Sequence, residues 1–216
     1  MRVVPRWALL SSAAAPVLLI GGWTWAATRQ PGGFDQVSGT ISALAARDAA
    51  DRWIMTVGLF GLGLCHCVTA AGLRPLRAAG RLLLALGGVA TVAVAAFPLP
   101  AERGSSTPHG IAAAMAFGAL ALWPALAAPG HRAPDPAAGL PPRWGTTAAA
   151  PLLALVGWFV VELVTGGPRI GLAERAASGA EALCPLLVVA TLIRRDRRTA
   201  ERAAGHPAAR SRGVDQ

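Results

Sequence analysis

Six apolar stretches, each about as long as a membrane-spanning helix, make up most of this chain of 216 residues. A helix needs about 20 apolar residues to cross a hydrocarbon core of roughly 30 Å. Charged residues make up only 14% of the sequence, against roughly 25% in an average soluble domain. Backbone hydrogen bonds must be satisfied inside a bilayer, and the stretches are too long for barrel strands. The predicted fold class is therefore an all-α bundle of six membrane spans.

The six spans are expected at 7–28, 53–73, 82–100, 109–128, 146–166 and 176–193. Residues 1–198 would then form one membrane domain, followed by a mobile basic tail at 199–216 on the cytoplasmic side. Between the first two spans, Val37, Ile41 and Leu44 recur at helical spacing. This pattern predicts a short helix that lies on the membrane surface or in the mouth of the bundle.

Arginine provides all twenty basic residues, and its distribution predicts the orientation of the chain. Connections rich in Arg face the cytoplasm in most membrane proteins. Fourteen arginines lie in the N-terminus, the second and fourth connections and the tail, and six lie in the other connections. Both termini are therefore expected in the cytoplasm. Because much of the net charge of +9 is in the tail, it favours the bilayer surface as a partner, and no nucleic acid is expected.

Metal ligands are sparse in the sequence. Zinc sites need several His or Cys ligands, and His66 stands between Cys65 and Cys67 inside the second span. Neighbouring residues on a helix point about 100° apart, so at most two of these three side chains could bind the same metal ion. We expect His66 to be a buried, hydrogen-bonded histidine. The sequence predicts no metal site and identifies no cofactor.

The sixth span carries polar residues on one face, because Glu174, Ser178 and Glu181 follow one another at helical spacing. A carboxylate facing hydrocarbon is costly, so this face should point into the bundle, toward partners or water. Glu162, on the fifth span, is expected to be a neighbour of the same face.

The first, third and fifth connections must lie on one side of the membrane, and they bring further polar residues together. His109 opens the fourth span, and Asp51 and Glu102 lie on adjoining connections. An imidazole among carboxylates can exchange protons near neutral pH, which suits general acid and base roles. The alternative is a histidine bonded to a nearby carboxylate, with ion pairs that only hold the ends of the helices together.

Several short motifs occur in a distinctive order: Thr40-Ile41-Ser42-Ala43-Leu44, Phe97-Pro98, His109 and Glu174-Arg175. With the six spans, this order resembles the bacterial membrane proteins grouped as domain-of-unknown-function family 998. The resemblance covers nearly the whole chain and implies a six-span fold in a bacterial cytoplasmic membrane. It also implies a shared polar site at Ser42, His109, Glu174 and Arg175, and it implies no reaction. Glu102 stands further along the chain than the acid that the family pattern leads us to expect.

The leading hypothesis is a membrane-embedded enzyme that acts on a lipid or isoprenoid-like substrate at the extracytoplasmic mouth of the bundle. His109 and Glu174 would exchange protons, and Ser42 would orient the substrate or attack it. The residues expected around the substrate are Arg175, Glu181, Glu162, Ser178, Asp51 and Glu102. Two other functions stay open, a small proton-coupled carrier and an assembly protein that binds a partner.

Overall fold

The computed structural model describes residues 4–128, 140 and 143–204, and these residues form helices joined by short connections. The helices are α1 (Arg6–Thr28), α2 (Ile41–Leu44), α3 (Trp53–Gly72), α4 (Ala78–Ala96), α5 (Thr107–Ala127), α6 (Trp144–Thr165) and α7 (Ile170–Ala204). The described part of the chain has no strand. The predicted all-α fold class is confirmed.

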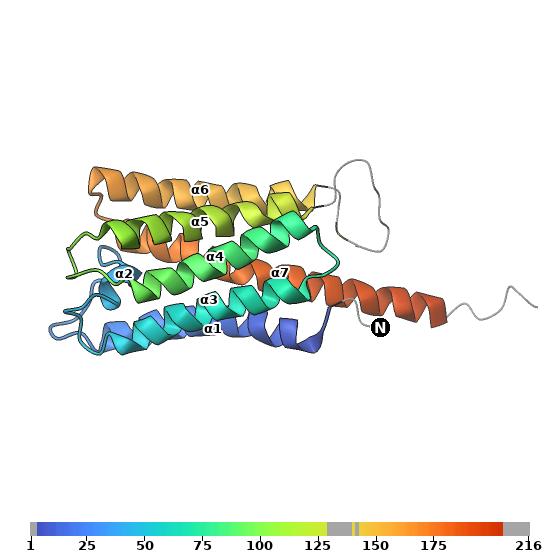
Figure 1. The fold of residues 1–216 in the computed structure, drawn as a ribbon, viewed down its shortest axis with the longest axis horizontal. Coiled ribbons are helices and arrows are strands. Elements are labelled where there is room, and N and C mark those ends of the chain that lie inside the picture. The colour runs from blue at the N-terminus through green and yellow to red at the C-terminus, as the bar shows by residue number, and fades with distance from the viewer. Residues whose placement is uncertain (1–3, 129–139, 141–142, 205–216) are drawn as a thin grey trace, which may run out of the picture.

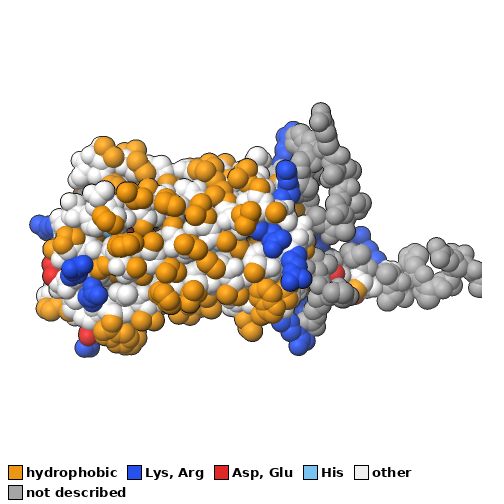
Figure 2. Space-filling model, viewed as in Figure 1, with side chains coloured by type: hydrophobic (Ala, Val, Ile, Leu, Met, Phe, Trp, Pro, Cys, Tyr) orange, Lys and Arg blue, Asp and Glu red, His pale blue; other side chains and the backbone are white. Residues whose placement is uncertain are grey.

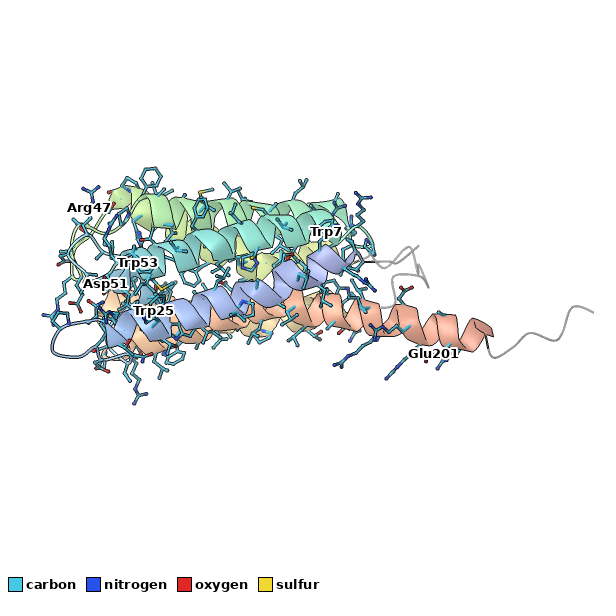
Figure 3. The ribbon with its side chains drawn as sticks, turned by 90° about the horizontal axis from the view of Figure 1, so that it is seen from below. Trp7, Trp25, Arg47, Asp51, Trp53 and Glu201 are labelled. Carbon is cyan, nitrogen blue, oxygen red and sulfur yellow. The ribbon has the colours of Figure 1, made fainter. Side chains whose placement is uncertain are left out.

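Every helix except α2 is long and apolar enough to cross a membrane, which gives six candidate spans. Figure 2 shows apolar side chains over the middle of the molecule and arginine side chains gathered toward its two ends. Tryptophans also mark the ends: Trp25 and Trp53 pack edge to face at one end, and Trp7 lies at the other (Figure 3). Such belts form where one side of the indole ring is apolar and the other is wet. The protein is an integral membrane protein.

The six long helices lie side by side around a common axis (Figure 1). Each packs on the next in the order α1, α3, α4, α5, α6 and α7, and α7 closes the ring against α1. The closest approach between α3 and α4 depends on glycine. A Cβ on Gly63 would lie 2.5 Å from the carbonyl oxygen of Gly88, so the two backbones pack directly on each other.

The three connections α1–α3, α4–α5 and α6–α7 meet at one end of the bundle, which we call the α2 end (Figure 1). The α3–α4 connection and the projecting part of α7 lie at the opposite end. This arrangement agrees with the expectation that the odd-numbered connections share one side. The proline-rich fourth connection, at 129–143, lies almost wholly outside the described residues, as do residues 205–216 of the expected tail.

Two helices differ most from the sequence prediction, α4 and α7, and α4 begins at Ala78 rather than at residue 82. Helix α4 ends at Ala96, before Phe97, because Pro98 disfavours helical geometry in the residue before it and cannot donate a backbone hydrogen bond. Helix α7 begins at Ile170 rather than near residue 176, and it continues to Ala204. Glu174 and Arg175 consequently lie inside the helix, where their side chains point in defined directions.

The short helix predicted between the first two spans is α2, and it lies in the mouth of the bundle. Ile41 and Leu44 are buried among the long helices, whereas Val37 lies outside the helix and is exposed. These two apolar side chains hold α2 in the mouth, so the polar residue between them is brought into the bundle interior.

Candidate functional site

Helix α2 positions Ser42. The Thr40 hydroxyl accepts a hydrogen bond of 3.0 Å from the backbone N–H of Ala43, and so caps the first turn. The backbone N–H of Arg47 donates to the carbonyl of Leu99, which ties the segment after α2 to the α4–α5 connection. With Ile41 buried next to it, Ser42 is half-buried and faces the interior.

His109 lies in the first turn of α5 and is buried. Ser106 caps this helix, and Pro108 stands in its first turn, where the missing N–H costs no intrahelical hydrogen bond. Nδ1 of His109 lies 2.9 Å from the carbonyl oxygen of Phe97, at the end of α4. That carbonyl is one of those that a helix end leaves without an intrahelical partner. His109 satisfies it, and its other ring nitrogen, Nε2, lies 3.2 Å from Oγ of Ser42.

Glu174 on α7 completes a chain of three hydrogen-bonded groups. Its Oε1 accepts a hydrogen bond of 3.1 Å from Oγ of Ser42, and its Oε2 accepts one from the backbone N–H of Ile41. The side chain is buried, with 4% of its surface exposed. Residues that are far apart in sequence thus form the chain His109, Ser42 and Glu174.

If both bonds of Ser42 form at once, the donors and acceptors of this chain require one extra proton. The carbonyl of Phe97 can only accept, so Nδ1 of His109 carries a proton. When Ser42 donates to Glu174, Nε2 of His109 needs a second proton in order to donate to Ser42. When Glu174 is protonated instead, it donates to Ser42, which then donates to a neutral imidazole. Both arrangements hold one extra proton, at His109 in the first and at Glu174 in the second, and Ser42 can pass it between them.

Ser42 and Glu174 face a cavity of about 50 Å³ at the centre of the bundle. Most of its wall is apolar and comes from α1, α3, α4 and α5. The apolar lining residues are Leu19, Ile41, Leu59, Leu62, Val94, Ala113, Ala116, Phe117 and Leu120, and the polar ones are Ser42, His66, Thr91, Glu174, Ser178 and Glu181. The structure therefore brings Ser178 and Glu181, expected near a substrate, to the same cavity as Ser42 and Glu174.

A second hollow, of about 470 Å³, opens on the outer side of α2. Gly39 and Ala43 contribute to this outer hollow, while Ile41 and Ser42 contribute to the inner cavity. Helix α2 thus separates the two spaces.

Arg175 lies beside Glu174 but points away from the inner cavity. Its Nη1 donates to the carbonyl oxygens of Gln36 at 2.9 Å, Gly39 at 2.7 Å and Gly171 at 3.0 Å. Its guanidinium stacks near the rings of Trp23 and Phe34, with centroid distances of 5.9 and 5.7 Å. In this position Arg175 fastens the segment before α2 to α7.

His66 differs from its sequence-based expectation. It is buried as expected, but neither ring nitrogen has a hydrogen-bond partner among the described residues, so the expected hydrogen bond to another part of the protein is not formed there. The reason is that the ring faces the cavity rather than a neighbouring helix. Across the same cavity, Oε1 of Glu181 also lacks a partner among the described residues. Sequence reasoning left His66 out of the site, although a histidine in the middle of a span was a signal for it.

Glu162, Asp51 and Glu102, which were expected near the substrate, also lie away from the inner cavity. Glu162 turns toward the α6–α7 connection, where it accepts hydrogen bonds from the indole of Trp158 at 3.2 Å and the backbone of Arg169 at 3.0 Å. Asp51 forms an ion pair of 2.8 Å with Arg29. Glu102 is exposed and lines the outer hollow.

The ion pair changes the acidity of its carboxyl group. A hydrogen bond from Arg29 holds the pKa of Asp51 below the ordinary value of 3.8. At the same end of the bundle, the Ser38 hydroxyl and the Val37 backbone lower the pKa of Asp35. Both carboxylates are thereby favoured in their charged form, and both belong to the connection that carries α2.

Within the described residues, no three His, Cys, Asp or Glu side chains are grouped closely enough to hold a metal ion. The three cysteines, all described, are free thiols. The chemistry that the arrangement offers is proton transfer among a carboxyl group, a hydroxyl group and an imidazole.

Comparison with known proteins identifies the family. A family model described as "Protein of unknown function (DUF998)" matches residues 13–193, which include Ser42, His109 and Glu174. No curated protein and no solved structure matches the chain. The match confirms the resemblance inferred from the motifs, and the chain belongs to the DUF998 family of membrane proteins of unknown function.

Proposed function

We propose that this protein is a membrane-embedded enzyme that acts on a lipid or isoprenoid-like substrate by acid-base chemistry, in a bacterial cytoplasmic membrane. One observation carries the proposal: the hydroxyl of Ser42 lies between His109 and Glu174, at the wall of an apolar cavity inside the bundle. Acid-base groups in a site with mostly apolar walls act more strongly than in bulk water, because the low dielectric amplifies their electrostatic effects.

The proposed chemistry begins at Glu174, which faces the cavity. Before the reaction Glu174 is a carboxylate and His109 is neutral, so the chain does not yet hold the extra proton. The carboxylate takes a proton from a hydroxyl group of the substrate, and Ser42 passes a proton on to Nε2 of His109. The negative charge that develops on the substrate oxygen is then balanced by the imidazolium. In the later step that requires a general acid, the proton returns along the same chain and Glu174 donates it to the product. The bond from His109 to the carbonyl of Phe97 keeps Nε2 directed at Ser42 throughout.

The walls of the cavity support a lipid-like substrate. The cavity of about 50 Å³ holds only the end of such a molecule, so a short apolar group can pack against residues such as Leu59, Leu62 and Phe117 while the polar group meets Ser42 and Glu174 in place of water. Arg175 is proposed to act indirectly, because its Nη1 is bonded to backbone carbonyls of the segment that carries α2. We place this mouth on the extracytoplasmic side, as the distribution of arginines favours.

The test is a lipid profile of cells that express the protein, measured by mass spectrometry of extracted membranes. Ser42→Ala, His109→Asn and Glu174→Gln should each lower the yield of the product by about 10²–10⁴-fold, the usual contribution of general acid-base catalysis. Because the three groups act as one unit, a double variant should have a product yield only slightly lower than that of a single variant.

Glu162→Gln is the matched control, since it changes an acid at the same end that does not face the cavity. It should leave the profile unchanged. Thermal unfolding in detergent checks that each variant is folded. Folded variants of Ser42, His109 and Glu174 with an unaltered lipid profile would refute the proposed enzyme.

A proton-coupled carrier is the second candidate, and a polar pair deeper in the bundle favours it. Ser11 and Thr69 share a hydrogen bond of 2.8 Å between α1 and α3, one helical turn beyond His66. Polar groups therefore continue past the cavity, toward the end opposite α2. Uptake of protons into proteoliposomes, driven by a candidate substrate and lost in Glu174→Gln, would favour the carrier over the enzyme.

A further inference from the structure

The inner cavity has a second polar region, separate from the Ser42–Glu174 contact. His66 on α3 has 1% of its surface exposed and Glu181 on α7 has 2%. Both ring nitrogens of His66 and Oε1 of Glu181 are without a hydrogen-bond partner in the part of the chain that the structure describes. Buried polar atoms nearly always have a partner, so these two side chains call for a group that both donates and accepts hydrogen bonds.

Helix geometry sets the distance between the two polar regions. Glu181 follows Glu174 on the same face of α7, and seven residues of helix rise by about 10 Å. Ser178 lies between them and also lines the cavity. Its hydroxyl donates to the carbonyl of Glu174, which leaves the oxygen of Ser178 able to accept. The polar lining of α7 thus continues from one carboxyl group to the other.

We propose that the cavity binds a short chain of water molecules that exchanges protons between Glu174 and the inner pair, His66 and Glu181. This proposal rests on the proposed function, because it supplies protons to the chain of Glu174, Ser42 and His109. Water is the ligand that suits the site, since each molecule donates and accepts. The cavity of about 50 Å³ exceeds the roughly 10–15 Å³ that a single water molecule needs, so it has room for more than one.

The side chains around the cavity offer water both donors and acceptors. The titratable side chains that line it are His66 from α3 and Glu174 and Glu181 from α7. The lining residues of α1, α2, α4 and α5 are apolar or carry hydroxyl groups, as Thr91 does. The hydroxyl of Thr91 donates to the carbonyl of Gly87, so its oxygen is available to accept from water.

The test uses water itself as the probe, in protein labelled with ¹⁵N-histidine and held in lipid nanodiscs. The N–H signal of the His66 ring, assigned by its loss in His66→Gln, should show a magnetisation-transfer peak from water. In D₂O it should exchange at once. If the ring shows no water peak and its N–H is protected for hours, the proposal is wrong.

Variants separate cavity water from general opening of the bundle. Ala116→Leu places a larger side chain in the cavity and should slow exchange of the His66 N–H by about tenfold or more, because exchange then waits for local opening. Ala114→Leu is the matched control on the exposed face of α5 and should change nothing. Ala113→Val, a smaller change in the cavity wall, should slow exchange in the same direction if Ala116→Leu does not fold.

Glu181→Gln tests the proton-transfer part of the proposal. It should slow exchange at His66 by about tenfold, because an amide at position 181 can no longer take up or release a proton. Unchanged exchange in this variant would refute the transfer, even if water is present. These readouts need no substrate, so they are independent of the lipid profile. A hydrated cavity together with an unaltered lipid profile in Ser42→Ala would refute the proposed enzyme and support the proposed water site.

Discussion

At the scale of single residues, buried polar groups divide into those that hold the fold and those that face the cavity. Arg175 belongs to the first kind, because its Nη1 joins α7 to the carbonyls of Gln36 and Gly39. Glu174, the residue before it on the same helix, accepts hydrogen bonds from Ile41 and Ser42 and faces the cavity. Neighbouring positions on a helix point about 100° apart, so one turn can serve both purposes.

Replacing Arg175 should therefore weaken the fold around α2. Arg175→Lys keeps the charge but has a shorter side chain, which withdraws the donor from the three carbonyls that Nη1 reaches, and it should lower the free energy of unfolding by about 2 kcal/mol. Unfolding in detergent measures this change. Arg169→Lys, at an exposed position just before α7, is the control and should have little effect. Equal stability of the two variants would show that the carbonyl contacts of Arg175 do not hold the segment.

The ion pair of Asp51 predicts a small dependence of stability on pH. The bond from Arg29 lowers the pKa of Asp51 in the folded protein below 3.8. The pair therefore stabilises the fold above the unfolded pKa and loses this effect as the pH falls through the lower, folded value. Asp51→Asn should be slightly less stable than the wild type at pH 7 and equal to it in strong acid. Asn tolerates the left-handed backbone of this residue, where φ is 48°, so the substitution adds little strain.

High salt supplies the control for this comparison. Screening should reduce the difference at pH 7, since the pair is exposed to solvent. A difference that persisted in acid and in high salt would mean that Asp51 acts through its backbone geometry.

At the scale of helices, close packing of small residues sets the shape of the bundle around the cavity. Gly63→Ala would bring a methyl group against the Gly88 carbonyl and to 2.7 Å from the side chain of Val92. This should destabilise the protein by about 1–3 kcal/mol, the usual cost of overpacking. Gly118→Ala is the matched control, because nothing lies within 4 Å of a Cβ there. That substitution should be neutral or stabilising by up to about 1 kcal/mol. Thermal unfolding of both variants in the same detergent checks the contrast.

Helices and their order could be predicted from the sequence, because apolar length and arginine-rich connections reflect the bilayer directly. The motif order also pointed to Ser42, His109 and Glu174, which the structure brings together. The direction of individual side chains could not be predicted as well. Glu162 turns to the α6–α7 connection because Arg169 offers it a backbone N–H there, and this depends on the turn rather than on helical spacing.

The partner of His66 also could not be predicted from the sequence. Its position in the middle of α3 predicted burial, and burial is what the structure shows. Whether a buried ring meets a partner or a cavity depends on how the neighbouring helices pack around it. No pattern within α3 contains that information.

At the scale of the whole molecule, the two ends of the bundle differ in composition. The α2 end carries the His109, Ser42 and Glu174 chain and the outer hollow. The opposite end carries the arginines of the α3–α4 connection and the projecting end of α7, on which Figure 3 labels Glu201. The arginines favour the opposite end as the cytoplasmic one.

Cysteine labelling in intact cells tests this orientation. In a variant without Cys65, Cys67 and Cys184, Ser105→Cys in the α4–α5 connection should react with a membrane-impermeant thiol reagent added outside. Ala79→Cys, exposed at the start of α4, should react only after the membrane is opened. The reverse pattern would place the site on the cytoplasmic side.

The most direct measurement of the central claim is the ¹⁵N spectrum of the His109 ring, assigned by its loss in His109→Asn. If His109, Ser42 and Glu174 form one proton-sharing unit, Nδ1 will carry a proton, and the Nε2 signal will shift both in Ser42→Ala and in Glu174→Gln while Glu162→Gln leaves it unchanged. The claim would be contradicted if Nδ1 carried no proton, or if the signals of the ring did not change in Glu174→Gln.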